Sequence, residues 1–145
     1  MSVLLAALVF CTMAAYMEYV AWFTHKYVMH GFLWALHEDH HHPKGRGLQK
    51  NDLFALLFSL VSFLFIYTGL RQRQEWLASA GFGVALYGVG YVLFHDVMFH
   101  RRIPGLRLRA RGPYLTRIVR AHRAHHKHSG RQDGVSFGFL YAPHE

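Results

Sequence analysis

Histidine is the residue type that stands out in this chain, with 13 among 145 residues. Ten of them form two kinds of group, and each kind occurs twice. The H-x2-H-H groups are His37/His40/His41 and His122/His125/His126, and the H-x4-H pairs are His25/His30 and His95/His100. On an α-helix, positions i, i+3 and i+4 fall within a sector of about 100°, so each H-x2-H-H group aims three imidazoles at one point. Imidazole nitrogen is a common metal ligand, and the pattern therefore predicts metal binding.

The H-x4-H pairs fit a regular helix less well. Residues i and i+5 lie about 140° apart on an α-helix. We therefore expect each helix to end or bend between its two histidines, and Gly31, directly after His30, favours this. Ten histidines exceed the four ligands of a structural zinc site and suit two metal ions with about five nitrogens each. Imidazole alone admits zinc, copper, iron or nickel.

The carboxylates exclude one class of site and suggest another. A ferritin-like di-iron site needs two Glu-x-x-His motifs, and only Glu38-x-x-His41 fits here, so that class is excluded. Residues 37–41 also match H-E-x-x-H, the zinc-protease motif, with Glu38 as the general base. An intramembrane zinc metalloprotease is therefore an alternative, although it leaves eight of the patterned histidines without a role.

Three apolar runs must position these histidines. Residues 2–23 are interrupted only by Glu18, and residues 53–70 and 77–94 contain no charged residue. A membrane-spanning helix needs roughly 17–25 predominantly apolar residues, so each run qualifies. Small residues such as Gly81 and Gly83 crowd the third run, which favours close helix contact in lipid. We predict an all-α, multi-pass transmembrane protein of three to four spans, forming one membrane-integral domain over residues 1–145.

The charges orient the spans. The net charge is +8, and most Lys and Arg residues follow the first and third runs. The positive-inside rule places residues 24–52 and 95–145 in the cytoplasm and the N-terminus outside. Every histidine lies in these two segments, so the predicted two-metal site faces the cytoplasm.

Composition also bears on other classes of protein. Clustered arginine is typical of nucleic-acid binding, but next to a membrane it is better explained by anionic headgroups, and we expect no nucleic-acid partner. The single cysteine, Cys11, excludes a disulfide scaffold and a cysteine-based zinc site.

Longer stretches resemble a known family. The segments MEYVAWFTHKYVMHG, HDVMFHRR, AHRAHHKH and DGVSFGFLYAP, with an H-x2-H-H group that ends in a proline, resemble the bacterial β-carotene 3-hydroxylases of the fatty-acid hydroxylase and sterol desaturase superfamily. The resemblance covers residues 17–42 and 94–143. It implies an O2-dependent, non-haem di-iron monooxygenase of the cell inner membrane. Such an enzyme hydroxylates C3 of β-ionone rings, turning β-carotene into zeaxanthin by way of β-cryptoxanthin, with electrons from ferredoxin and its reductase.

The resemblance also carries a set of ligands. The motif-matched metal ligands are His25, His30, His37, His40, His41, His95, His100, His122, His125 and His126. The family is often drawn with four spans, whereas three are clear here, and the extra His42 makes a run of three histidines. A fatty-acid or sterol hydroxylase, or a carotenoid ketolase acting at C4, belongs to the same superfamily and stays an alternative.

Four further residues are candidates for contact with the ligand histidines. Glu18 lies seven positions before His25, on nearly the same helix face, and we expect it to accept the second ring N–H of a ligand histidine. Asp96, beside His95, is expected to act in the same way. For His42 and His128 a solvated position is favoured, with contact to a ligand as the other possibility, and His144 is expected to be solvated.

Overall fold

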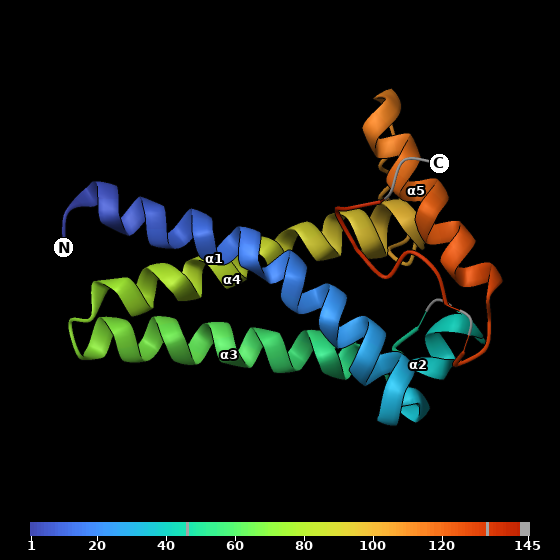
Figure 1. Cartoon of the computed structure of the whole chain (residues 1–145), viewed down its shortest axis with the longest axis horizontal. Helices are drawn as coiled ribbons and strands as arrows, with labels where there is room; N and C mark the ends of the chain where they lie inside the picture. The colour runs from blue at the N-terminus through green and yellow to red at the C-terminus, as the bar shows by residue number, and fades with distance from the viewer. Residues whose placement is uncertain (46, 133, 143–145) are drawn as a thin grey trace.

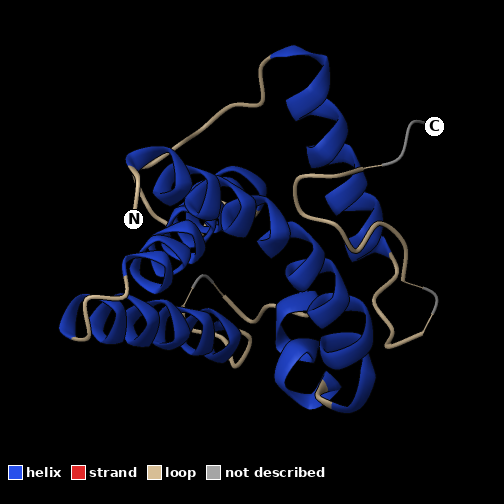
Figure 2. Cartoon of the chain, turned by 60° about the vertical axis from the view of Figure 1, so that its left-hand side comes forward, coloured by secondary structure: helices blue, strands red, loops and turns tan. Residues whose placement is uncertain are grey.

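The computed structural model describes residues 1–45, 47–132 and 134–142, and its regular elements are all helices. The order is α1 (Val3–Phe23), η1 (Thr24–Phe32), α2 (Trp34–His41), α3 (Asp52–Arg71), α4 (Glu75–Tyr91), η2 (Val92–Phe99) and α5 (Gly112–Lys127). The described part of the chain contains no strand (Figure 2). The prediction of an all-α fold is confirmed.

Three helical stretches are long and apolar enough to cross a membrane: Val3–Phe32, Asp52–Arg71 and Glu75–Phe99. Their outward side chains are large and apolar, and Leu56, Phe63 and Leu70 are each 60–64% exposed. A water-soluble bundle would present polar side chains there, so these faces are suited to lipid. The three predicted spans are confirmed, and no fourth is found in the described residues. The first and third run farther than predicted, because helical hydrogen bonding continues through η1 and η2.

Helix α4 is central and packs against both α1 and α3. Small residues permit these contacts, as the sequence predicts. A Cβ added at Gly81 would lie 2.7 Å from Ile66 Cγ1 on α3, and one at Gly83 would lie 2.6 Å from the Phe10 carbonyl oxygen on α1. The backbones therefore approach more closely than any side chain at these two positions would allow.

The elements that carry histidine gather at one end of the bundle (Figure 1). The N-terminus and the short α3–α4 turn lie at the opposite end. Helix α5 stands apart from the three long helices, and the chain after α5 returns alongside it toward the bundle (Figure 2). The two histidine-rich segments thus meet at the same end of the spans, as the site requires.

Candidate metal centre

The H-x4-H pairs lie in or directly beside π-helices: His25 and His30 belong to η1, while His95 belongs to η2 and His100 directly follows it. In a π-helix the hydrogen bond runs from residue i to residue i+5, so two residues five apart lie one above the other. The His100 amide donates to the His95 carbonyl oxygen at 3.0 Å, which is a bond of this kind. The expectation that the helix ends or bends between paired histidines is wrong: the non-helical residue in η1 is Gly31, after His30. A widened helix, not an interrupted one, aligns each pair.

The ten patterned histidines converge into two groups. The first group is His25, His30, His37, His41 and His125, and the second is His40, His100, His122 and His126. Within each group the potential ligand nitrogens lie within 4.8 Å of one another. His95 adjoins the second group, because its Nε2 lies 3.1 Å from Nε2 of His40. Each H-x2-H-H motif divides between the groups, so the expectation that one motif aims three imidazoles at one point is wrong. Helices α2 and α5 each contribute to both groups and hold them together.

In the first group the outward-facing nitrogens are fixed by oxygen acceptors. Nδ1 of His25 donates to the Phe137 carbonyl oxygen at 3.0 Å, and Nδ1 of His125 donates to that of Val135 at 2.7 Å. Nδ1 of His30 donates to the Arg131 carbonyl oxygen at 3.2 Å. These oxygens accept only, so each Nδ1 carries the proton and each Nε2 of a neutral ring is left with a lone pair.

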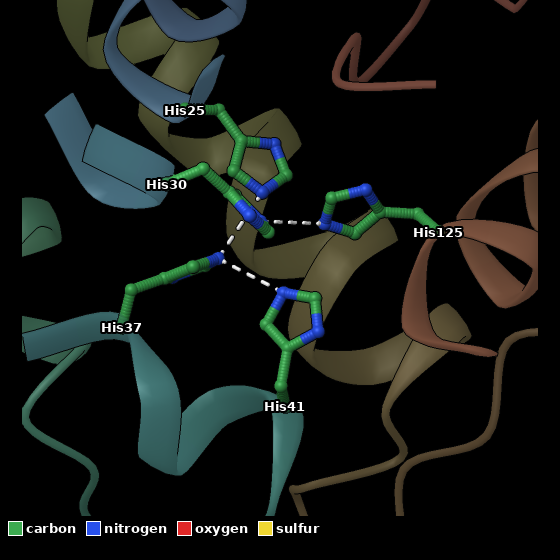
Figure 3. A group of neighbouring side chains, drawn as sticks. All are labelled: His25, His30, His37, His41 and His125. Carbon is green, nitrogen blue, oxygen red and sulfur yellow. Dashed lines mark hydrogen bonds between the residues drawn. The ribbon is translucent and has the colours of Figure 1, made fainter. Parts of the chain in front are cut away.

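Those lone pairs point at one another (Figure 3). The Nε2 atoms of His25 and His37 are 3.2 Å apart, as are those of His30 and His125. Nε2 of His41 also lies 3.2 Å from Nε2 of His37, whose Nδ1 donates to Asn51 Oδ1 at 2.7 Å. The rings come from η1, α2 and α5 and surround one point.

The second group has the same design. Nδ1 of His40 donates to Gln49 Oε1 at 2.9 Å and Nδ1 of His95 to Asp96 Oδ1 at 2.9 Å, which again leaves two Nε2 lone pairs face to face. The Nε2 atoms of His122 and His100 are 2.7 Å apart. Nε2 of His126 is buried without a hydrogen-bond partner. Buried polar groups normally have partners, so this atom lacks one that the protein does not supply.

Burial keeps the imidazoles outside the spans neutral. It lowers the pKa of His40 to about 4 and that of His41 and His100 to about 3. It likewise lowers the pKa of His122 and of His126, and neighbouring histidines lower both further. At neutral pH these rings therefore carry no positive charge that would repel a metal cation.

A metal ion fits both groups. Two ligand nitrogens about 2.1 Å from one ion and at right angles are about 3 Å apart, close to the 2.7–3.2 Å between facing Nε2 atoms. A cation at each centre would convert lone-pair repulsion into coordination. Imidazole nitrogen suits first-row transition metals, including iron.

Acidic residues fix the second group from outside. Asp96 Oδ1, which accepts a hydrogen bond from His95, also accepts one from Arg102 Nη1 at 3.3 Å. Arg102 also donates hydrogen bonds from Nη1 and Nη2 to the two carboxylate oxygens of Asp52, each at 2.7 Å. The expected contact between Asp96 and a patterned histidine is therefore present. The acceptors Asn51, Gln49 and the carbonyls after α5 were not found from the sequence, because no local motif links them to the histidines.

The other sequence candidates lie elsewhere. Glu18 hydrogen-bonds to none of the histidines that the structure describes; its carboxylate accepts from Tyr87 and from the backbone of residues 139–141, so the expectation of a ligand-histidine partner is wrong. His42 is exposed, and its Nε2 donates to the Ser129 carbonyl oxygen at 3.1 Å. His128 ends α5 and is exposed, and His144 lies outside the described residues.

The position of Glu38 argues against the metalloprotease alternative, in which this residue would be the general base. Glu38 is exposed, whereas its neighbours His37 and His41 are buried in the first group. The first group consists of five histidines, and no carboxylate among the described residues belongs to it. The carboxylate is therefore not placed to activate a metal-bound water.

Comparison with known proteins agrees with this arrangement. A family model, fatty acid hydroxylase, matches residues 10–142. The chain belongs to the fatty acid hydroxylase family. The beta-carotene hydroxylase of Pantoea ananas is 43% identical over 140 residues, covering 95% of this chain and 77% of that protein. That of Pseudescherichia vulneris is 44% identical over 128 residues, covering 87% and 70%. That of Paracoccus sp. (strain PC1) is 38% identical over 130 residues, covering 88% and 78%. The resemblance read from the sequence is confirmed.

No solved structure gives a significant match to this fatty acid hydroxylase. Its own geometry therefore supplies the description of the site.

In this fatty acid hydroxylase an apolar cavity of about 620 Å³ leads from the histidines into the bundle. His25, His37, His95 and His122 line it, and along α3 the lining runs from Phe54 to Ile66. An advance of twelve residues along a helix corresponds to about 18 Å, so the cavity is long.

The cavity is also open sideways. Phe63 and Val89 line it and are 60% and 57% exposed. These side chains belong to the apolar faces of α3 and α4 that are suited to lipid. A hydrocarbon dissolved in the bilayer could therefore enter without crossing water.

Proposed function

We propose that this protein is a carotenoid ring hydroxylase that adds a hydroxyl group at C3 of β-ionone rings, converting β-carotene to zeaxanthin by way of β-cryptoxanthin. The single observation that carries the proposal is a long apolar cavity, open to the lipid side, whose wall includes histidines of both groups. Its shape and polarity match a long hydrocarbon. The curated relatives with that activity in their name support the choice of substrate.

We propose two non-haem iron ions as the cofactor and O2 as the co-substrate. The first group and the second group with His95 would each hold one ion through imidazole nitrogen. When bound, iron supplies the activation of O2 that an unactivated ring C–H demands, chemistry that amino-acid side chains do not provide. The proposed metal ligands are the ten patterned histidines. His42 and His128 are not among them.

The protein's part is to bind, orient and exclude water. The apolar wall holds the polyene by area contact, without polar anchors along most of its length. Tyr91 lines the cavity beside His95, and its ring stacks on that imidazole with centroids 4.4 Å apart. Phe137 and Phe139 cover the cavity from the C-terminal side.

We further propose the membrane arrangement. The spans would lie in the cell inner membrane with the N-terminus outside and residues 24–52 and 95–145 on the cytoplasmic side, which the distribution of Lys and Arg supports. Electrons would come from ferredoxin and its reductase, and the basic tail suits an acidic protein donor.

The test is pigment analysis of a bacterial host that accumulates β-carotene and expresses the full chain. We expect zeaxanthin with some β-cryptoxanthin, and only β-carotene from the His122→Ala variant at equal protein level. Canthaxanthin would identify a C4 ketolase instead. Unchanged β-carotene with hydroxylated fatty acids or sterols would identify a different substrate class, and either result would refute the proposal.

A further inference from the structure

Glu18 lies inside the first span, and its carboxylate is completely engaged by donors. Oε1 accepts the backbone N–H groups of Phe139, Leu140 and Tyr141 at 2.9, 2.8 and 3.0 Å. Oε2 accepts the hydroxyl of Tyr87 at 2.7 Å. An acidic side chain within a span is costly and commonly functional. Here no metal-binding nitrogen explains it.

Three separate parts of the chain meet at this carboxylate. Glu18 belongs to α1 and Tyr87 to α4, while the backbone donors belong to the C-terminal segment, residues 134–142. The turn around Glu18 is tight: a Cβ added at Gly138 would lie 2.5 Å from the Tyr141 carbonyl oxygen and 3.3 Å from Glu18 Oε1. The segment therefore docks on the spans through Glu18, and glycine at 138 permits the close approach.

The same segment reaches the first histidine group. The Phe137 carbonyl oxygen, two residues before the first N–H held by Glu18, accepts the ring N–H of His25 at 3.0 Å. The Val135 carbonyl oxygen accepts that of His125 at 2.7 Å. By contrast, His40 and His95 of the second site are fixed by Gln49 and Asp96, which are outside the segment.

We propose that Glu18 is a positioning residue for one of the two metal ions, the one held by the first histidine group. It fixes the C-terminal segment, whose carbonyl oxygens set the tautomer and orientation of His25 and His125. The second group does not depend on this contact. The inference rests on the proposed two-metal function, and it adds that the two sites respond differently to a change at a residue that hydrogen-bonds to neither histidine group.

The alternative is that Glu18 only stabilises helix packing. In that case its removal would lower the melting temperature and affect both metal sites equally or neither. Partners that orient ligand histidines from outside are worth about 10- to 100-fold in metal affinity. Site-selective weakening of that size therefore separates the two explanations.

The test is cobalt(II) binding to the full-length protein, purified in detergent and stripped of metal, followed by absorption spectroscopy. We expect the wild type to bind two ions per chain. Glu18→Ala should weaken one class of site by at least about tenfold and leave the other unchanged. Glu18→Gln keeps an acceptor oxygen for the backbone donors, so it should restore most of the loss.

A second variant and a control keep the test sharp. Gly138→Ala disturbs the same turn without removing charge, and we expect it to weaken the same site as Glu18→Ala. Gly83→Ala disturbs α1–α4 packing through Phe10 instead, and should lower the melting temperature while both sites bind normally.

The proposal would be overturned if Glu18→Ala and Gly138→Ala bound cobalt(II) at both sites as tightly as the wild type. It would also be overturned if both sites lost affinity to the same extent. So would loss of one site in Gly83→Ala. The binding measurement does not depend on pigments, so selective loss combined with a failed hydroxylation assay would refute the proposed substrate and still support the role of Glu18.

Discussion

Gly88 is the position at which the size of the cavity can be tested most directly. It lines the cavity on α4, and a Cβ added there would meet no atom within 4 Å. It precedes Tyr91 by three residues and His95 by seven, about 10 Å along the helix. A larger side chain would therefore project into the space that the polyene must occupy while its ring lies near the histidines. The protein itself has room for that side chain.

We expect Gly88→Leu to reduce hydroxylation of β-carotene without unfolding the protein. Forcing added methylene groups into a filled apolar site costs about 1–3 kcal/mol, which corresponds to roughly 5- to 150-fold in apparent affinity. The assay is the yield of β-cryptoxanthin plus zeaxanthin per unit of membrane-inserted protein in the carotene-accumulating host. Iron content and melting temperature should stay at wild-type values, since neither the histidines nor the helix contacts change.

Gly90 supplies the matched control. It is two residues away on the same helix, a Cβ there also meets nothing within 4 Å, and it does not line the cavity. Gly90→Leu should therefore keep wild-type yield. A Gly88→Leu protein as active as the wild type, or a Gly90→Leu protein that falls equally far, would refute the assignment of this cavity as the substrate site.

Three other predictions follow from the site. Because burial holds the pKa of His40 and His125 at about 4, against 6.5 in the unfolded chain, the unfolded state binds protons first as pH falls. The melting temperature of metal-free protein should therefore be highest above pH 6.5 and fall toward pH 4, and a flat profile by circular dichroism would contradict this. Asp96→Ala removes the acceptor of the His95 ring N–H, so cobalt(II) should bind at the second site about 10- to 100-fold more weakly by equilibrium dialysis, and wild-type affinity would show that the contact is dispensable. Glu38→Gln should keep full zeaxanthin yield because Glu38 is exposed, whereas loss of that yield would contradict its position outside the site.

The sequence predicts the histidine groups well because their spacing is local. In H-x2-H-H the positions i, i+3 and i+4 share a helix face whatever the tertiary structure, and His122, His125 and His126 all belong to the metal groups. They do not share one centre, because His125 lies in the first group and His122 and His126 lie in the second. The three spans are predictable for a similar reason, since length and hydropathy alone determine whether a helix can cross a bilayer. The division of each motif between two metal groups is not local, because it depends on how α2 and α5 face each other.

The contacts of Glu18 show where prediction from sequence fails. The seven-residue spacing predicts that Glu18 and His25 lie on nearly the same helix face, but this holds only if the helix is a regular α-helix between and around them. The widened turn in η1 changes the face on which later residues lie. The true donors are distant in sequence: Tyr87 is 69 residues away, and the backbone donors at Phe139 and its neighbours are more than 100 residues away. Carbonyl oxygens that fix His25 and His125 are equally invisible, because every residue has one.

The two π-helices connect the sequence pattern to the chemistry. A π-helical turn is rare and is frequently found at functional sites. In the described part of this chain it occurs twice, and both times it contains or borders an H-x4-H pair at the end of an apolar span. Five-residue spacing leaves two histidines on different faces of an α-helix, so only the widened turn lets both face one centre. Facing Nε2 lone pairs then oppose the arrangement unless a cation lies between them. The proposed metal ions would therefore also favour this local conformation, and in this chain the H-x4-H spacing and the π-helical turn serve the same set of candidate ligands.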